Sequence, residues 1–212
     1  MPTATIAKKS MTYSYSRLAL FERCERAFYH KYVEERPDPS GAPAIIGKIF
    51  HYAMELVINE GYDPEDAVYA SIYIHNGLPE GEVADSLIYM VNRTYNRLLQ
   101  YQDEFADIIT ELHLVVETEH GKLQGYLDLV VDNPVTDELT IADYKTTWQP
   151  FSAEESQQLK LYAWMYKQMR GGYVASTYRG KLIFPRRSEF ADSDVIFTEE
   201  ELEDAYNWAV TI

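Results

Sequence analysis

The first half of the chain carries the spacing of amphipathic helices. Apolar side chains recur three or four positions apart in residues 14–33, 44–59 and 83–104, and a shorter helix is expected after the DPED sequence at 63–66. Segments rich in proline and glycine interrupt the pattern at 36–43 and 77–81. The spacing therefore predicts a mainly helical part over about residues 1–105.

The pattern changes to that of strands at about residue 111. Residues 111–147 are rich in β-branched side chains, and turn sequences at 120–121 and 132–138 divide them into three consecutive antiparallel strands. A helix is expected over 153–169, then strands at 178–185 and 194–198, and a closing helix at 199–210. This order predicts one mixed α/β domain over residues 1–212, with a core over about 106–212 in which helices flank a mixed sheet.

Two charged residues lie two positions apart in the third of these strands. Asp143 and Lys145 should project from the same face, because side chains alternate along a strand. If the turn at 132–138 is centred between Val135 and Thr136, Asp128 lies directly opposite Asp143, with Cβ atoms about 5 Å apart. Two carboxylates so close destabilise a sheet unless a cation lies between them. A solvent-exposed ion pair is the alternative, and a register slip of one residue would move Asp128 to the opposite face.

Further polar groups are placed where they can join these charges. Gln158 and Tyr162 lie four positions apart and share one helix face, where they can contact a phosphate or orient Lys145. Their alternative interpretation is a rim residue and a core residue. Gly125, inside a strand, indicates a bulge, a close backbone approach or a glycine next to a turn. His51, on the flank of the helix at 44–59, is either a boundary residue or a ligand that completes a Mn²⁺ or Mg²⁺ site with two carboxylates.

These residues, taken in order, resemble a known family. Gly47-x-x-x-His51, Gly125-x-x-Asp128, Asp143-x-Lys145 and Gln158-x-x-x-Tyr162 are similar to the motifs of the RecB-type branch of the PD-(D/E)XK nuclease superfamily. The similarity spans roughly residues 13–185. It implies a restriction-endonuclease-like fold, in which an antiparallel three-strand meander forms the basis of a mixed sheet.

The resemblance also implies the roles of the site residues. His51, Asp128, Asp143 and the Tyr144 carbonyl would bind one or two Mg²⁺ or Mn²⁺ ions. Lys145 would position or activate the attacking water, while Gln158 and Tyr162 would support the site and the DNA backbone. In some members an acid on the preceding strand contributes, which here indicates Glu117 or Glu119.

The single cysteine distinguishes the chain from some of these relatives. The CRISPR-adaptation exonuclease and the AddB nuclease domain hold an iron–sulfur cluster with four cysteines, whereas this chain has only Cys24. We therefore expect a cluster-free protein, closer to stand-alone phage-type exonucleases, with Cys24 as a small buried apolar residue. One cysteine also excludes an intramolecular disulfide and favours a reducing cytoplasm.

Charge and hydropathy narrow the choice of partners. The net charge of −15 argues against a simple nucleic-acid coat protein, but residues 1–48 hold eight Lys and Arg against five Asp and Glu. No apolar run approaches the length of a membrane span, and the N-terminus lacks the apolar region of a secretory signal. DNA is expected to bind the N-terminal lobe through Arg17, Arg23, Arg26 and Lys48, or else along Arg179, Lys181, Arg186 and Arg187.

The sequence therefore favours a metal-dependent DNA exonuclease of recombination or repair, with DNA and a possible recombination or repair protein as partners. An endonuclease that uses the same site is the first alternative. A superfamily member that binds nucleic acid without cleaving it is the second.

Overall fold

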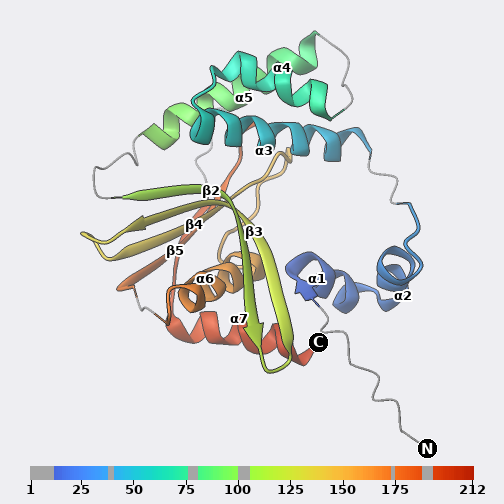
Figure 1. Cartoon of the computed structure of the whole chain (residues 1–212), viewed down its shortest axis with the longest axis vertical. Coiled ribbons are helices and arrows are strands. Elements are labelled where there is room, and N and C mark those ends of the chain that lie inside the picture. The colour runs from blue at the N-terminus through green and yellow to red at the C-terminus, as the bar shows by residue number, and fades with distance from the viewer. Residues whose placement is uncertain (1–11, 38–40, 76–80, 100–105, 173–174, 188–192) are drawn as a thin grey trace, which may run out of the picture.

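The protein folds into a sheet with helices on both faces. The computed structural model describes residues 12–37, 41–75, 81–99, 106–172, 175–187 and 193–212. Helices α3 (Ala42–Glu60), α4 (Pro64–Ile74) and α5 (Glu82–Leu98) lie above the sheet in Figure 1, and α6 (Gln157–Met169) and α7 (Glu199–Thr211) lie below it. The predicted fold class is confirmed.

The sheet is mixed and is built on the predicted meander. Its strands are β1 (Thr12–Ser14), β2 (Asp107–Thr118), β3 (Gly121–Asn133), β4 (Glu138–Tyr144), β5 (Thr177–Ile183) and β6 (Ser193–Phe197). The pairs β2–β3, β3–β4 and β5–β6 are antiparallel, while β4–β5 and β1–β3 are parallel. Helix α6 connects β4 to β5, as a parallel pair requires. The sequence did not predict β1, since three residues are too few to show alternation.

The N-terminal helical segment spans the predicted range but is interrupted. Helix α1 (Tyr15–Arg23) ends at Cys24, whose extended backbone separates it from α2 (Glu25–Phe28) and the π-helical turn Tyr29–Val33. Cys24 is exposed, so its interpretation as a buried apolar residue is wrong. The expected helix at 83–104 ends as α5 at Leu98, and residues 100–105 lie outside the described part.

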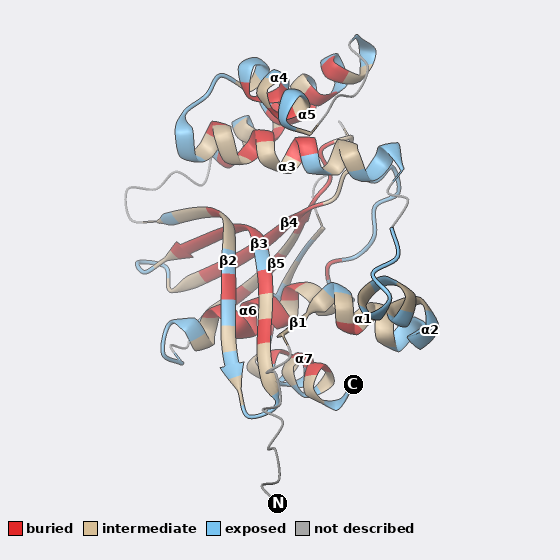
Figure 2. Ribbon diagram, turned by 45° about the vertical axis from the view of Figure 1, so that its right-hand side comes forward, coloured by how far each residue is buried: buried red, intermediate tan, exposed pale blue. Residues whose placement is uncertain are grey.

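Two apolar cores lie on the two faces of the sheet (Figure 2). The α3 side holds Ile49, Phe50 and Met54 of α3, and the α6 side holds Leu159, Leu161 and Met165 of α6, all fully buried. Both cores include residues of β3 and β4, so the helices on each side anchor to the same two strands. None of the helices in the described ranges is long and apolar enough to cross a membrane.

The alternation of side chains along β3 shifts by one position at Asp128. Leu127 lies in the core on the α6 side, whereas Leu129, two positions further, lies in the core on the α3 side. Regular alternation would place both on one face, so the strand rotates between them. Opposite Asp128 on β2 is Glu111, which has a left-handed backbone with φ of 50°. A non-glycine residue rarely adopts this conformation, and it marks the same local rotation in β2.

Candidate active site

The predicted register between β3 and β4 is confirmed. Leu129 pairs with Ala142, and the same offset carried one step further places Asp128 opposite Asp143. The ladder ends at this point. Beyond it, the backbone N–H of Tyr144 donates to Asp128 Oδ2 at 2.7 Å. A side chain therefore replaces the missing strand partner, and the carboxylate is fixed between β3 and β4.

Glu111, Asp128 and His51 form a group of potential metal ligands. His51 Nδ1 lies 3.2 Å from Glu111 Oε1 and 3.3 Å from Asp128 Oδ1. One ligand atom from each of the three residues lies within 4.8 Å of the others. Imidazole and carboxylate groups are common ligands of divalent cations, so this group fits the divalent metal that the sequence motifs imply.

Glu111 is the acid on the preceding strand that the sequence analysis failed to identify. Glu117 instead pairs with Lys122 and Glu119 lies beside His120, both at the far end of the β2–β3 hairpin. The expected turn at 120–121 would have placed His113 opposite Asp128 instead. With the turn centred between Glu119 and His120, the residue opposite Asp128 is Glu111.

Asp143, Lys145 and Gln158 form a closed polar triangle beside this group. Gln158 Nε2 donates to Asp143 Oδ1 at 2.9 Å, and Lys145 Nζ donates to Gln158 Oε1 at 3.2 Å. Lys145 Nζ also lies 2.6 Å from Asp143 Oδ2 as an ion pair. That oxygen is buried and accepts no well-directed hydrogen bond within the described residues. The ammonium group of Lys145 is the charged partner of this oxygen, so a metal ion bound here would share or displace that contact.

Two tyrosines hold the site in shape. The ring of Tyr144 contacts those of Phe50 and His51 edge-on, which fixes the imidazole against the sheet. The ring of Tyr162 lies against Gly125, where an added Cβ would be only 2.6 Å from a ring carbon. Gly125 is therefore needed for this close approach, which involves a side chain rather than the expected bulge or backbone contact.

The electrostatics indicate too many negative charges for the metal-free protein. Burial lowers the pKa of His51, but hydrogen bonds and charges from Asp128 and Glu111 outweigh it and raise this pKa to about 10. Burial, followed by the charge of Asp128, raises the pKa of Asp143 well above its usual range. Burial also raises the pKa of Tyr162 to about 12, so its phenol stays neutral. These raised pKa values favour bound protons, which reduce the repulsion among the carboxylates. A bound divalent cation would neutralise the same negative charges.

The structure brings together most of the residues that the motifs indicated. His51, Asp128, Asp143, Lys145, Gln158 and Tyr162 converge from α3, β3, β4 and α6, and the backbone of Tyr144 borders the same point. The basic residues do not converge in this way. Arg17 donates to the Thr12 carbonyl and covers the Tyr32 ring, and Arg179 is bound by Glu138 and Asp194.

The sequence itself matches a family model. The description of that model is PD-(D/E)XK nuclease superfamily, and the match covers residues 12–208. The chain belongs to this superfamily. The resemblance drawn from the motifs is confirmed, and the superfamily uses divalent metals and acts on nucleic acids. A single cysteine leaves no set of four for an iron–sulfur cluster.

A solved structure shares the fold of this chain. The crystal structure of a candidate exonuclease from Eubacterium rectale superposes with a TM-score of 0.57 at 12% identity, covering 93% of this chain and 77% of that one. The structure of SSO0001 matches with a TM-score of 0.34 at 12% identity, over 89% and 85% of the two chains, which is too low to support a comparison. No curated protein matches the chain by sequence.

Proposed function

We propose that this PD-(D/E)XK protein is a divalent-metal-dependent deoxyribonuclease that works as an exonuclease in DNA recombination or repair. The observation that carries the proposal is the convergence of Glu111, Asp128 and His51 beside the triangle of Asp143, Lys145 and Gln158. Mg²⁺ and Mn²⁺ are the proposed cations, and the reducing cytoplasm is the proposed location.

The residues divide into those that hold the cation and those that act on the substrate. Glu111, Asp128, Asp143 and His51 would hold it, joined by the Tyr144 carbonyl. When bound, the cation supplies charge neutralisation and an activated water for phosphodiester hydrolysis. Lys145 is fixed by Asp143 and Gln158, so its ammonium group is directed by two partners rather than left to move freely. Its charge positions the attacking water or the phosphate.

Two other functions use the same residues. An endonuclease would need the same metal and the same lysine and would differ only in how the DNA enters. The name of the E. rectale protein, an exonuclease, favours the exonuclease proposal. A protein that only binds nucleic acid would gain nothing from a buried, mutually repelling pair such as Asp128 and Asp143.

The test is digestion of end-labelled linear DNA and covalently closed circular DNA, each single- and double-stranded, with Mg²⁺ or Mn²⁺. An exonuclease degrades only the linear forms, and an endonuclease also cuts the circles. A protein that cuts neither, but binds both, is a binding module. Asp143→Asn serves as the inactive control, because it removes a proposed ligand while keeping the hydrogen-bonding shape of the side chain.

A further inference from the structure

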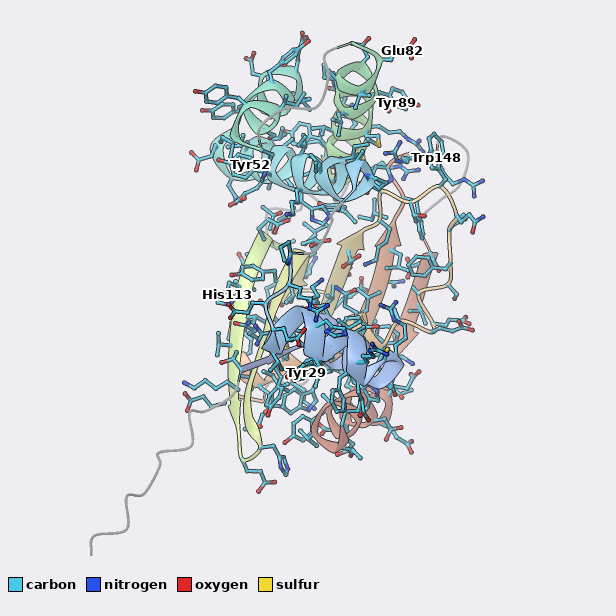
Figure 3. The ribbon with its side chains drawn as sticks, turned by 90° about the vertical axis from the view of Figure 1, so that its right-hand side faces the viewer. Tyr29, Tyr52, Glu82, Tyr89, His113 and Trp148 are labelled. Carbon is cyan, nitrogen blue, oxygen red and sulfur yellow. The ribbon has the colours of Figure 1, made fainter. Side chains whose placement is uncertain are left out.

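Trp148 is the exposed aromatic residue nearest in sequence to Lys145 and is 69% exposed. In Figure 3 it projects at the surface beside α3. The guanidinium carbon of Arg186 lies 4.9 Å from the centre of its ring. Arg186 Nε donates to the Thr146 carbonyl at 2.6 Å, so the arginine is anchored to the chain segment that carries the tryptophan. The two side chains form one preorganised unit.

Arg186 carries a charge that no described carboxylate neutralises. Within the described ranges no carboxylate lies at ion-pair distance from it, whereas Arg179 contacts both Glu138 and Asp194. Only its Nε has a hydrogen-bond partner among these residues, so the other guanidinium N–H groups can serve a ligand. In a protein with a net charge of −15, an anchored arginine without an acidic partner is a suitable contact for an anion.

A pocket of about 780 Å³ lies between this unit and the start of α3. Its walls come from Ala42–Ala44 and Ile46 on one side and from Thr146–Gln149 with Arg186 on the other. Its lining is mainly apolar, with a few polar groups, which is the usual character of a site for a flat ring. Its size is within the range of small-molecule sites.

This pocket adjoins the proposed metal site. Thr146 lines the pocket and directly follows Lys145, and α3 contributes both Ile46 to the pocket and His51 to the metal site. Trp148 follows Lys145 by three positions, so their Cα atoms are at most about 10 Å apart. A stacked strand rises about 3.4 Å per nucleotide, so a base on Trp148 would lie within about three nucleotides of the scissile phosphate.

We propose that Trp148 and Arg186 form a base-stacking subsite for an unpaired nucleotide of the strand that is cut. The free face of the indole ring receives the nucleobase, and the guanidinium of Arg186 contacts the adjoining phosphate. A base within a duplex already has neighbours on both faces, so the subsite selects a frayed end or a single strand. The inference rests on the proposed function, because it takes the scissile phosphate to lie at the metal site.

The test combines a protein variant with a modified ligand. Single-stranded oligonucleotides carry one abasic residue at successive positions, and binding is measured with Ca²⁺ in place of Mg²⁺. At one position near the cleavage point, loss of the base should weaken binding to the wild type at least about five-fold, the lower end of the stacking range. Trp148→Ala should weaken binding to the intact oligonucleotide equally and remove the sensitivity to that abasic position. Trp148→Phe should restore part of the affinity and part of the sensitivity to the abasic position.

The control variant is Tyr73→Ala, which removes an aromatic side chain that is 85% exposed on α4 and should leave both measurements unchanged. Arg186→Ala should weaken binding and reduce its dependence on salt by about one phosphate contact. The subsite alone would be overturned if the wild type cuts DNA but Trp148→Ala changes neither the affinity nor the sensitivity to abasic positions. Wild-type protein that neither binds nor cuts any oligonucleotide would overturn the proposed function and the subsite together.

Discussion

Asp128 Oδ2 accepts the backbone N–H of Tyr144 at 2.7 Å, at the step where the β3–β4 ladder stops. The bond takes the place of a strand–strand hydrogen bond and leaves Oδ1 facing His51 at 3.3 Å. One carboxylate thus closes the sheet and offers an oxygen to a cation. The position of the proposed metal is set by the backbone of β4 as much as by any side chain.

The buried carboxylate of Asp143 should lower the stability of the folded protein, although cleavage requires it as a proposed metal ligand. Asp143→Asn should reduce cleavage at least about a hundred-fold, since it removes a proposed metal ligand. It should also leave the melting temperature in EDTA unchanged or higher, because the neutral amide is not repelled by Asp128. Thermal unfolding and single-turnover cleavage measure the two effects. Full activity in this variant would remove Asp143 from the site.

Two glutamates on β2 provide a matched comparison. Glu111→Gln should weaken Mn²⁺ binding about ten-fold or more and reduce cleavage, because Glu111 lies with His51 and Asp128. Glu117→Gln should do neither, since Glu117 is exposed and contacts only Lys122 among the described residues. Calorimetric titration with Mn²⁺ compares them directly. Equal behaviour of the two variants would show that Glu111 is not a ligand.

The metal-free protein should lose stability as the pH rises from about 6.5 to 9.5. The pKa of His51 is raised in the folded state to about 10, so its stabilising charge is fully present below its ordinary value of 6.5 and is lost as the pH approaches 10. The pKa of Asp143 is also raised in the folded state, so this residue too makes the protein less stable as the pH rises, beginning at a lower pH than His51 does. His51 is partly exposed, so we expect a change of about 1–2 kcal/mol, or a few degrees in melting temperature.

Thermal unfolding in EDTA at several pH values measures this slope. His51→Gln should flatten it, and His113→Gln, which alters a histidine stacked on Tyr126 away from the cluster, should leave it in place. Added Mn²⁺ should stabilise the wild type more at pH 8.5 than at pH 6.5, because fewer protons then compete for the ligands. A stability that rises with pH in EDTA would contradict the proposed charge balance.

Two motif glycines should respond differently to alanine. Gly125→Ala should destabilise the protein by about 1–3 kcal/mol, because the new Cβ would meet the Tyr162 ring at 2.6 Å. Gly47→Ala should be neutral or stabilising by up to about 1 kcal/mol, since its Cβ would lie 3.5 Å from Thr146 Oγ1 and alanine favours the helix. Urea unfolding in EDTA checks both. Equal stability of the two variants would mean that Tyr162 moves aside freely.

The sequence predicted the parts of the site that depend on local spacing. Strand alternation and one hairpin centre were sufficient to place Asp128 opposite Asp143, and helical spacing put Gln158 and Tyr162 on one face. Glu111 was missed because a turn at 120–121 places His113 opposite Asp128, whereas the observed turn is centred one residue earlier and places Glu111 there. Cys24 was expected to be buried because it is the single cysteine of the chain and cannot join a cluster. No local pattern marks the break between α1 and α2, where Cys24 is exposed.

Other features depend on contacts between distant segments, which no local pattern encodes. The parallel pairing of β1 with Lys122–Gln124 joins residues more than a hundred positions apart. The stack of Arg186 on Trp148 joins two loops that meet only because β4 and β5 are neighbours in the sheet. The sequence analysis grouped Arg186 with Arg179 by proximity in the chain, whereas their surroundings separate them.

The position of β3 between the two cores has a consequence for how the protein unfolds. The strand contributes Leu127 to one core and Leu129 to the other, so neither core can lose this strand without exposing apolar surface in both. We therefore propose that the helical part and the sheet melt in a single cooperative transition. Hydrogen exchange in the interior of α3 should then be as slow as in the centre of α6. The proposed metal ligands His51 on α3 and Asp128 on β3 should be lost in the same event.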